Sequence, residues 1–184
     1  MTDPAALVVD ALAAPADPAL DEALGAGPAA ALREALRGRA LAWARAHAPA
    51  LHAVVPDAAA AVDALRSHEG PVLLVAPDVP GLDDRLAEAA LADLRAGANL
   101  AMAPATDGRP FLVALATADP ALVEQAAGGL QDREAAAALV GGEFGLLRSE
   151  RRLVSPGDAR AFSADPLTPP QIAALLRSEP MPPR

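Results

Sequence analysis

The chain has 184 residues, a length that suits a single domain able to bury a substantial core. Its net charge is −9 and the dense positive patch that duplex binding requires is missing, so we expect no nucleic-acid partner. The absence of cysteine excludes disulfides, thiolate zinc sites and cysteine nucleophiles. The sequence shows neither a signal peptide nor an apolar segment of membrane-spanning length, so we expect a cytoplasmic protein without a membrane span.

The first half of the chain alternates short apolar runs with helical patterns. Pro28 suits the first turn of a helix, and leucines and alanines recur on one face after it. The prolines at 15 and 18 favour a loop, because each fixes its own backbone and removes a hydrogen-bond donor. The elements expected here are a strand at 6–10, a loop at 13–20, a helix at 28–48, a strand at 51–55 and a helix from Asp57 to about 67.

The second half continues the alternation and ends in a proline-rich tail. Its expected elements are strands at 72–76, 100–103 and 111–116, helices at 83–95, 119–127, 132–140 and 170–177, a strand-like segment at 144–154 and an extended loop at 155–170. Strands that alternate with helices indicate βαβ units. We therefore predict one α/β domain over residues 1–178, with a mostly parallel sheet and helices on both faces, followed by a flexible tail at 179–184.

Two aspartates follow expected strands. The segment 71–82 is a short apolar run that ends abruptly at Asp78, a proline and a glycine. The segment 100–114 repeats this arrangement about one helix later, with Asp107 at its turn. Ligands of open α/β folds bind at the carboxyl ends of the strands, so the two aspartates predict a ligand site at that edge of the sheet.

The same two segments carry a resemblance to a known family. They resemble the core of small bacterial transferases with the nucleotide-diphospho-sugar transferase (GT-A) fold, and among these the selenium-domain-associated glycosyltransferase-like family. The residues that match its signature are Asp78, Pro80, Gly81, Leu82, Pro104, Asp107, Gly108 and Leu112. Weaker likeness extends to residues 7–15 and 165–169. The resemblance implies a metal-dependent glycosyl- or nucleotidyl-transferase that acts on a nucleotide or nucleotide-sugar diphosphate, and it leaves the oligomeric state open.

The resemblance and the strand-end turns together predict roles for four residues. Asp78 would bind Mg²⁺ or Mn²⁺ against a diphosphate, and Asp107 would be a catalytic carboxylate beside the metal or the acceptor. Gly108 would contact the nucleotide. Arg109 departs from the family's motif, and beside the strand-end turn its guanidinium would bind a phosphate and partly offset the family's basic segment, which this chain lacks. Each also has a purely structural interpretation: Asp78 as a turn or capping residue, Asp107 and Gly108 as an ordinary turn, and Arg109 as a solvated side chain.

Several features depart from the family pattern. The family has a basic segment after its first strand, whereas residues 18–22 here are acidic and would repel a polyphosphate. The stretch before Val72 is shorter than in the family. Arg148, Arg151 and Arg152 form a small basic cluster that we expect on a solvated strand edge. The acidic segment and the shorter stretch favour an alternative function, in which a degenerate, non-catalytic member of the fold serves as a binding or interaction module. A third possibility is a likeness of architecture alone.

Overall fold

The protein folds around one six-stranded sheet. The structure is a computed structural model that describes residues 3–141 and 144–177, so the predicted tail at 179–184 lies outside the described residues. The strands are β1 (Ala5–Val9), β2 (His52–Val55), β3 (Val72–Val75), β4 (Leu100–Pro104), β5 (Pro110–Leu115) and β6 (Gly145–Leu146). They lie in the order β2-β1-β3-β5-β4-β6. Only β5 runs against the others, which confirms the prediction of a mostly parallel sheet.

The central strands are apolar along their whole length because both faces of the sheet are covered. Every residue of β1, β3 and β5 is buried, and Leu7 of β1 pairs in register with Leu74 of β3. A strand with solvent on one side would alternate apolar and polar residues, whereas a strand between two helical layers does not. The run at 72–75 therefore forms the strand that the sequence predicts, buried, parallel to β1 and antiparallel to β5.

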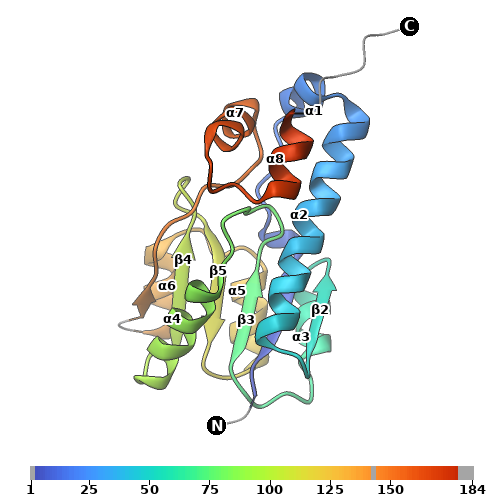
Figure 1. The fold of residues 1–184 in the computed structure, drawn as a ribbon. Coiled ribbons are helices and arrows are strands. Elements are labelled where there is room, and N and C mark those ends of the chain that lie inside the picture. Colours follow the sequence, from blue (N-terminus) through green and yellow to red (C-terminus); the bar gives the residue numbers. More distant parts are fainter. Residues whose placement is uncertain (1–2, 142–143, 178–184) are drawn as a thin grey trace, which may run out of the picture.

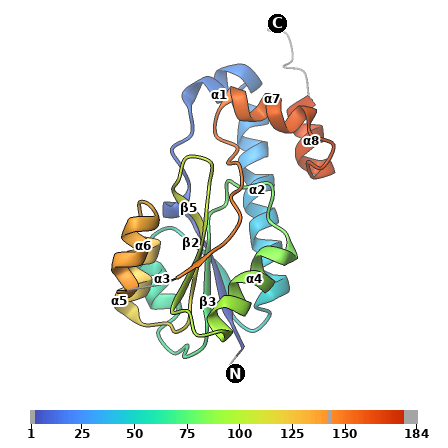
Figure 2. The same cartoon turned by 90° about the vertical axis from the view of Figure 1, so that its left-hand side faces the viewer.

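Helices form a layer on each side of the sheet. Helices α2 and α4 cover one face, and α3, α5 and α6 cover the other (Figures 1 and 2). The described helices are α1 (Pro18–Leu24), α2 (Ala26–His47), α3 (Ala58–Ala64), α4 (Asp84–Arg95), α5 (Pro120–Ala127), α6 (Arg133–Val140), α7 (Pro156–Ala164), α8 (Pro170–Arg177) and the short 3₁₀ helix η1 (Asp10–Leu12). The prediction of helices on both faces is confirmed.

Four helical segments form a cap beyond the carboxyl ends of β1 and β3. Helix α2 is long enough that its N-terminal half extends past the sheet, where it packs against α1 and α8 (Figure 1). Helix α7 packs against α1 and α8 in turn. We call α1, residues 26–37 of α2, α7 and α8 the helical cap. These helices and Leu153, from the segment before α7, form an apolar cluster separate from the larger core around the sheet, consisting of Leu20, Leu24, Ala29, Leu32, Leu36, Leu153, Ala159 and Ile172. The carboxyl edge of the sheet thus lies between two hydrophobic cores.

The helix α1 corrects the expected loop at 13–20. Pro18 stands in the first turn of this helix, where its missing N–H is not needed, and Asp17 caps the helix by accepting the N–H of Ala19 at 2.9 Å. Leu20 is buried in the helical cap. A proline taken as a loop signal therefore starts a helix whose apolar face packs against α2.

The helix α7 corrects the expected extended loop at 155–170 for the same reason. Pro156 stands in its first turn, and Ser155 and Asp158 form a reciprocal capping box at its start. The segment 144–154 was expected as a strand, but within its described residues it forms only the two-residue β6 and an isolated bridge at Glu150. Its remaining residues run across the sheet edge toward α7.

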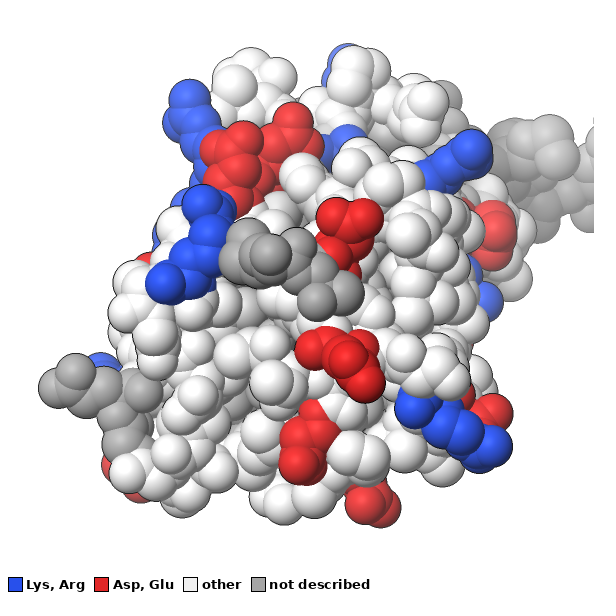
Figure 3. Space-filling view, turned by 90° about the horizontal axis from the view of Figure 1, so that it is seen from below, with Lys and Arg blue, Asp and Glu red and all other residues white. Residues whose placement is uncertain are grey.

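The opposite end of the molecule has a mixed surface. Figure 3 shows this face from below, with acidic residues across its middle and arginines toward its sides. Charges of the two signs are interspersed there rather than gathered into a positive patch. No helix in the described ranges, 3–141 and 144–177, is long and apolar enough to cross a bilayer.

Candidate functional site

Asp78 lies at the carboxyl edge of the sheet, three residues after β3 ends. Its side chain is 11% exposed. One of its carboxylate oxygens, Oδ2, accepts the N–H of Ala14, in the loop that follows β1, at 2.9 Å. The sequence-predicted position of Asp78 at a strand end is therefore correct, and its carboxylate faces the neighbouring strand end rather than open solvent.

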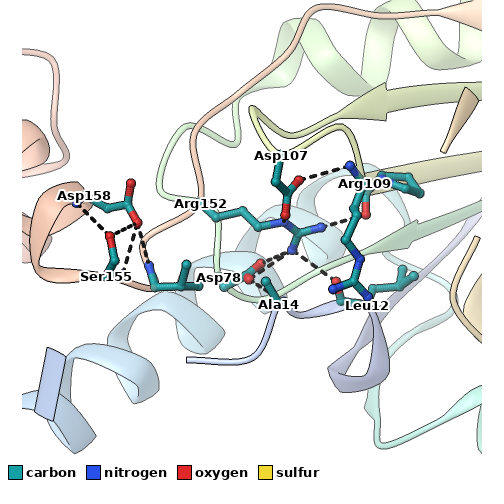
Figure 4. Close-up of polar contacts among 10 residues, drawn as sticks. Leu12, Ala14, Asp78, Asp107, Arg109, Arg152, Ser155 and Asp158 are labelled. Carbon is teal, nitrogen blue, oxygen red and sulfur yellow. Dashed lines mark hydrogen bonds and ion pairs between the residues drawn. The ribbon is translucent and has the colours of Figure 1, made fainter. Parts of the chain in front are cut away.

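The partner of Asp78 is Arg152, which is only 3% exposed. Its Nη1 donates to both Asp78 oxygens, at 2.7 and 2.9 Å, and also to the carbonyl of Leu12 at 3.0 Å. Its Nη2 donates to the carbonyl of Pro110 at 2.8 Å. Figure 4 shows the guanidinium at the centre of these groups. One buried side chain thus joins the ends of β1 and β3 to the beginning of β5.

Asp107 lies on the other side of the same guanidinium. It belongs to the turn between β4 and β5, and its Oδ2 is 3.7 Å from Nε of Arg152, too far for a hydrogen bond. That Nε is buried and has no hydrogen-bond partner among the described residues. The structure therefore brings Asp78 and Asp107 together, as the sequence suggested, but with Arg152 between them.

The turn after Asp107 has a local structural explanation. Oδ1 of Asp107 accepts the backbone N–H of Arg109 at 3.0 Å, and Gly108 adopts φ +84°, a conformation that favours glycine. Arg109 is half-buried, and its guanidinium has no ion-pair partner among the described residues. The side chain of Asp107 remains 41% exposed, so it is accessible to a ligand as well as structural.

Arg152 is the site residue that sequence reasoning missed. The expectation of a solvated arginine is wrong for this residue, because the segment around it crosses the ends of two strands. The backbone N–H of Glu150 donates to the backbone carbonyl of Pro104 at 3.2 Å, and the backbone N–H of Leu153 donates to the backbone carbonyl of Asp78 at 2.9 Å. In an extended segment neighbouring side chains point to opposite sides, so Arg151 is exposed while Arg152 is buried. The sequence offers one weak signal, the apolar pair Leu153–Val154 that follows.

The arrangement does not fit a divalent metal at Asp78. Both Asp78 oxygens already bind a cation, and no group of three histidine, aspartate or glutamate side chains able to hold a metal occurs among the described residues. Two unit charges 4 Å apart near a protein surface interact by about 4 kcal/mol, and a dication beside a guanidinium would experience roughly twice that as repulsion. Arg152 occupies the position in which a metal would neutralise the carboxylate.

The loop after Asp78 is held by side chains of the helix α2 and of the 144–154 segment. Arg39 donates to the carbonyls of Pro80 and Leu82, at 2.9 and 2.6 Å. Arg148 pairs with Asp83 at 2.9 Å and with Glu150 at 2.8 Å. Burial alone would lower the pKa of Arg148, but the hydrogen bonds to these two carboxylates and the attraction of their negative charges together outweigh it and raise the pKa above its ordinary value. The loop is therefore a fixed part of the site.

A pocket of about 400 Å³ lies between the helical cap and the sheet edge, and we call it the edge pocket. Its lining is mostly apolar, and its residues are Asp10, Ala13, Ala14, Ala16, Leu20, Ala30, Arg33, Glu34, Leu36, Arg37, Pro77, Asp78, Leu153 and Val154. Two arginines of α2 line it, and each pairs with a carboxylate: Arg33 with Asp21 and Arg37 with Asp10. The acidic 18–22 segment is thus paired, through Asp21, with one arginine of a different element, Arg33, which the sequence pattern did not indicate.

The comparisons with known proteins support this fold. No protein-family model matches the chain, and no curated protein matches it. Among solved structures, the chain is similar to a protein of Desulfovibrio desulfuricans G20 that is provisionally named a nucleotide-diphospho-sugar transferase. The TM-score is 0.66 at 18% sequence identity, and the match covers 96% of this chain and 98% of the other. The chain has a nucleotide-diphospho-sugar transferase-like α/β fold. At this identity the likeness shows the fold alone.

Proposed function

We propose that this protein is a metal-independent member of the fold that binds a nucleotide or nucleotide-sugar in the edge pocket without transferring a group. The observation that carries the proposal is the buried Arg152–Asp78 pair. It neutralises the carboxylate that would otherwise bind a metal, and it leaves the pocket beside it intact. This is the binding-module function that the departures from the family pattern favour.

The pocket has the position and the size that such a ligand needs. Ligands of open α/β sheets bind beyond the carboxyl ends of the strands, where the edge pocket lies. Small-molecule sites range over about 300–1,000 Å³ and are mostly apolar with a few polar groups. Leu20, Leu36 and Leu153 offer apolar walls to a base or to one face of a sugar ring. The name of the similar Desulfovibrio protein supports a nucleotide-sugar as the ligand class.

A second candidate is the metal-dependent transferase that the resemblance implies. It is favoured by the convergence of Asp78 and Asp107 on one guanidinium. Arg152 would have to leave the site before Asp78 could hold Mg²⁺ or Mn²⁺ and Asp107 could act on the acceptor. This movement would break two hydrogen bonds to buried carbonyls as well as the ion pair, so we place this candidate second.

The two candidates differ in their response to metal. The experiment measures thermal unfolding with nucleosides, nucleoside diphosphates and nucleotide-sugars, each in EDTA and in Mn²⁺, for the wild type and Asp78→Asn. A ligand at one hundred times its Kd should stabilise the wild type by about 2.7 kcal/mol in either condition. The same samples, analysed by chromatography, should show no turnover of the nucleotide-sugar.

The outcomes are distinct. Stabilisation that requires Mn²⁺ and is abolished in Asp78→Asn would favour the transferase over our proposal. Stabilisation by none of the nucleosides, nucleoside diphosphates or nucleotide-sugars would refute both. Arg109→Ala in the same assay tests the sequence prediction that Arg109 contacts a phosphate, since neither Arg109 nor Gly108 lines the edge pocket.

A further inference from the structure

We propose that Arg33 and Arg37 bind the phosphate groups of the ligand in the edge pocket. This inference rests on the proposed function and names the groups that recognise the charged part of the ligand. The two arginines lie one turn apart on α2, so they share a face of the helix, and both line the pocket. Their side chains are 44% and 42% exposed, so a ligand can reach both guanidinium groups.

The existing partners of these arginines hold them at the pocket. Asp21 of α1 binds Nη2 of Arg33, and Asp10, directly after β1, binds Nη2 of Arg37. A guanidinium has five N–H donors, and one carboxylate uses at most two of them. Each arginine therefore keeps donors for a phosphate while its carboxylate limits the rotation of the side chain. Phosphate oxygens match the planar donor arrangement of arginine, which is the preferred side chain for such groups.

The carboxylates also compete with the ligand. Both ion pairs are partly exposed to solvent, and pairs of this kind contribute little to stability. An incoming diphosphate can therefore displace the carboxylates from the guanidinium groups or bind the same guanidinium groups beside them. Glu34 lines the same pocket and adds a third negative charge, whereas the carboxylate of Asp78, which also lines it, is paired with Arg152. A ligand with negative charges on two neighbouring phosphates can contact both guanidinium groups. A ligand with a single carboxylate group can contact only one of them. We expect the pocket to favour a diphosphate over a monoanion.

The other cations nearby are less suited to this role. Arg152 is buried and paired with Asp78, and it does not line the edge pocket. Arg109 does not line it either. Among the described residues, the arginines that line this pocket are Arg33 and Arg37. They provide positive charge at the ligand pocket, although this chain lacks the basic segment that the family has after its first strand.

The experiment measures binding by calorimetry in EDTA for three probes: inorganic pyrophosphate, nucleoside diphosphates and the matching nucleosides. The variants are Arg33→Gln, Arg37→Gln, their double, Asp21→Asn and the control Arg45→Gln. Arg45 is an exposed arginine on the same helix, outside the pocket.

Each single arginine variant should lower the affinity for pyrophosphate and nucleoside diphosphates about tenfold, with a larger loss in the double variant. Asp21→Asn removes a competitor of the ligand for Arg33 and should raise the affinity several-fold. Nucleoside binding should be the same in all variants, and Arg45→Gln should match the wild type with every probe.

The results separate the inference from the proposed function. The inference is overturned if the double variant binds pyrophosphate and nucleoside diphosphates as the wild type does, if the wild type binds neither, or if nucleoside affinity falls in parallel. If nucleosides bind and the diphosphate group adds nothing to their affinity, the proposed function stands and the inference about Arg33 and Arg37 is refuted. Arginine-dependent binding of pyrophosphate, with no binding of nucleosides or nucleotides, supports the anion site and refutes the proposed function.

Discussion

Replacing Arg152 with methionine should lower the free energy of unfolding by about 3 to 5 kcal/mol, because it leaves a buried carboxylate without its cation. The side chain is 3% exposed, and methionine fills part of its volume without replacing any hydrogen bond. The carbonyls of Leu12 and Pro110 would lose their side-chain donors as well. For a chain of this length, a loss of this size corresponds to a drop in melting temperature of roughly 6 to 20 °C.

Urea unfolding of Arg152→Met, Asp78→Asn and their double variant measures the coupling between the two side chains. We expect the double variant to be less destabilised than the sum of the single variants, by up to about 3 kcal/mol, because each single variant already breaks the pair. The control is Arg151→Met. Arg151 pairs with Asp158 at 3.5 Å, its side chain is 50% exposed, and its loss should change stability by less than about 0.5 kcal/mol. Equal effects of Arg151→Met and Arg152→Met, or strict additivity in the double variant, would refute the structural role of Arg152.

Two further predictions follow from the same geometry. Arg152→Ala leaves Asp78 and Asp107 without the cation between them, so Mn²⁺ at ten times its Kd should stabilise this variant by about 1.4 kcal/mol in thermal unfolding. The wild type and the Asp78→Asn/Arg152→Ala double variant should not respond to Mn²⁺, and an equal response of the wild type would contradict the reasoning. Gly38→Ala should raise the free energy of unfolding by about 0.5 to 1 kcal/mol, because Gly38 lies inside α2 with open space around it. Gly108→Ala should lower it by about 1 to 2 kcal/mol, because Gly108 has φ +84°; the same sign for both glycine variants in urea unfolding would show that backbone conformation is not the cause.

Much of the secondary structure could be predicted from local patterns. Helix α2, expected at 28–48, is observed at Ala26–His47, and its Ala-rich sequence still has a buried apolar face. The strand before Asp78 was predicted because a buried strand is a continuous apolar run. The helices α1 and α7 were missed because a proline marks a helix start as readily as a loop, and the local sequence does not say whether an apolar face is available for packing.

The candidate site was predicted in part. The sequence placed Asp78 and Asp107 at strand ends on one edge of the sheet, and in the structure they lie on either side of the Arg152 guanidinium. The metal, the catalytic role of Asp107 and the nucleotide contacts of Gly108 and Arg109 remain predictions. What the sequence could not indicate was the partner of these carboxylates, which lies 74 residues after Asp78 in the chain.

The sequence by itself determined the α/β alternation and the position of two aspartates at the carboxyl edge of the sheet. These features depend on apolar periodicity and on turn residues, which are local properties. The tertiary structure alone decided that Arg152 is buried between the aspartates and that Arg33 and Arg37 line the adjoining pocket. The charge that a carboxylate meets depends on which distant segment packs beside it, and two adjacent arginines, one exposed and one buried, look alike in the sequence.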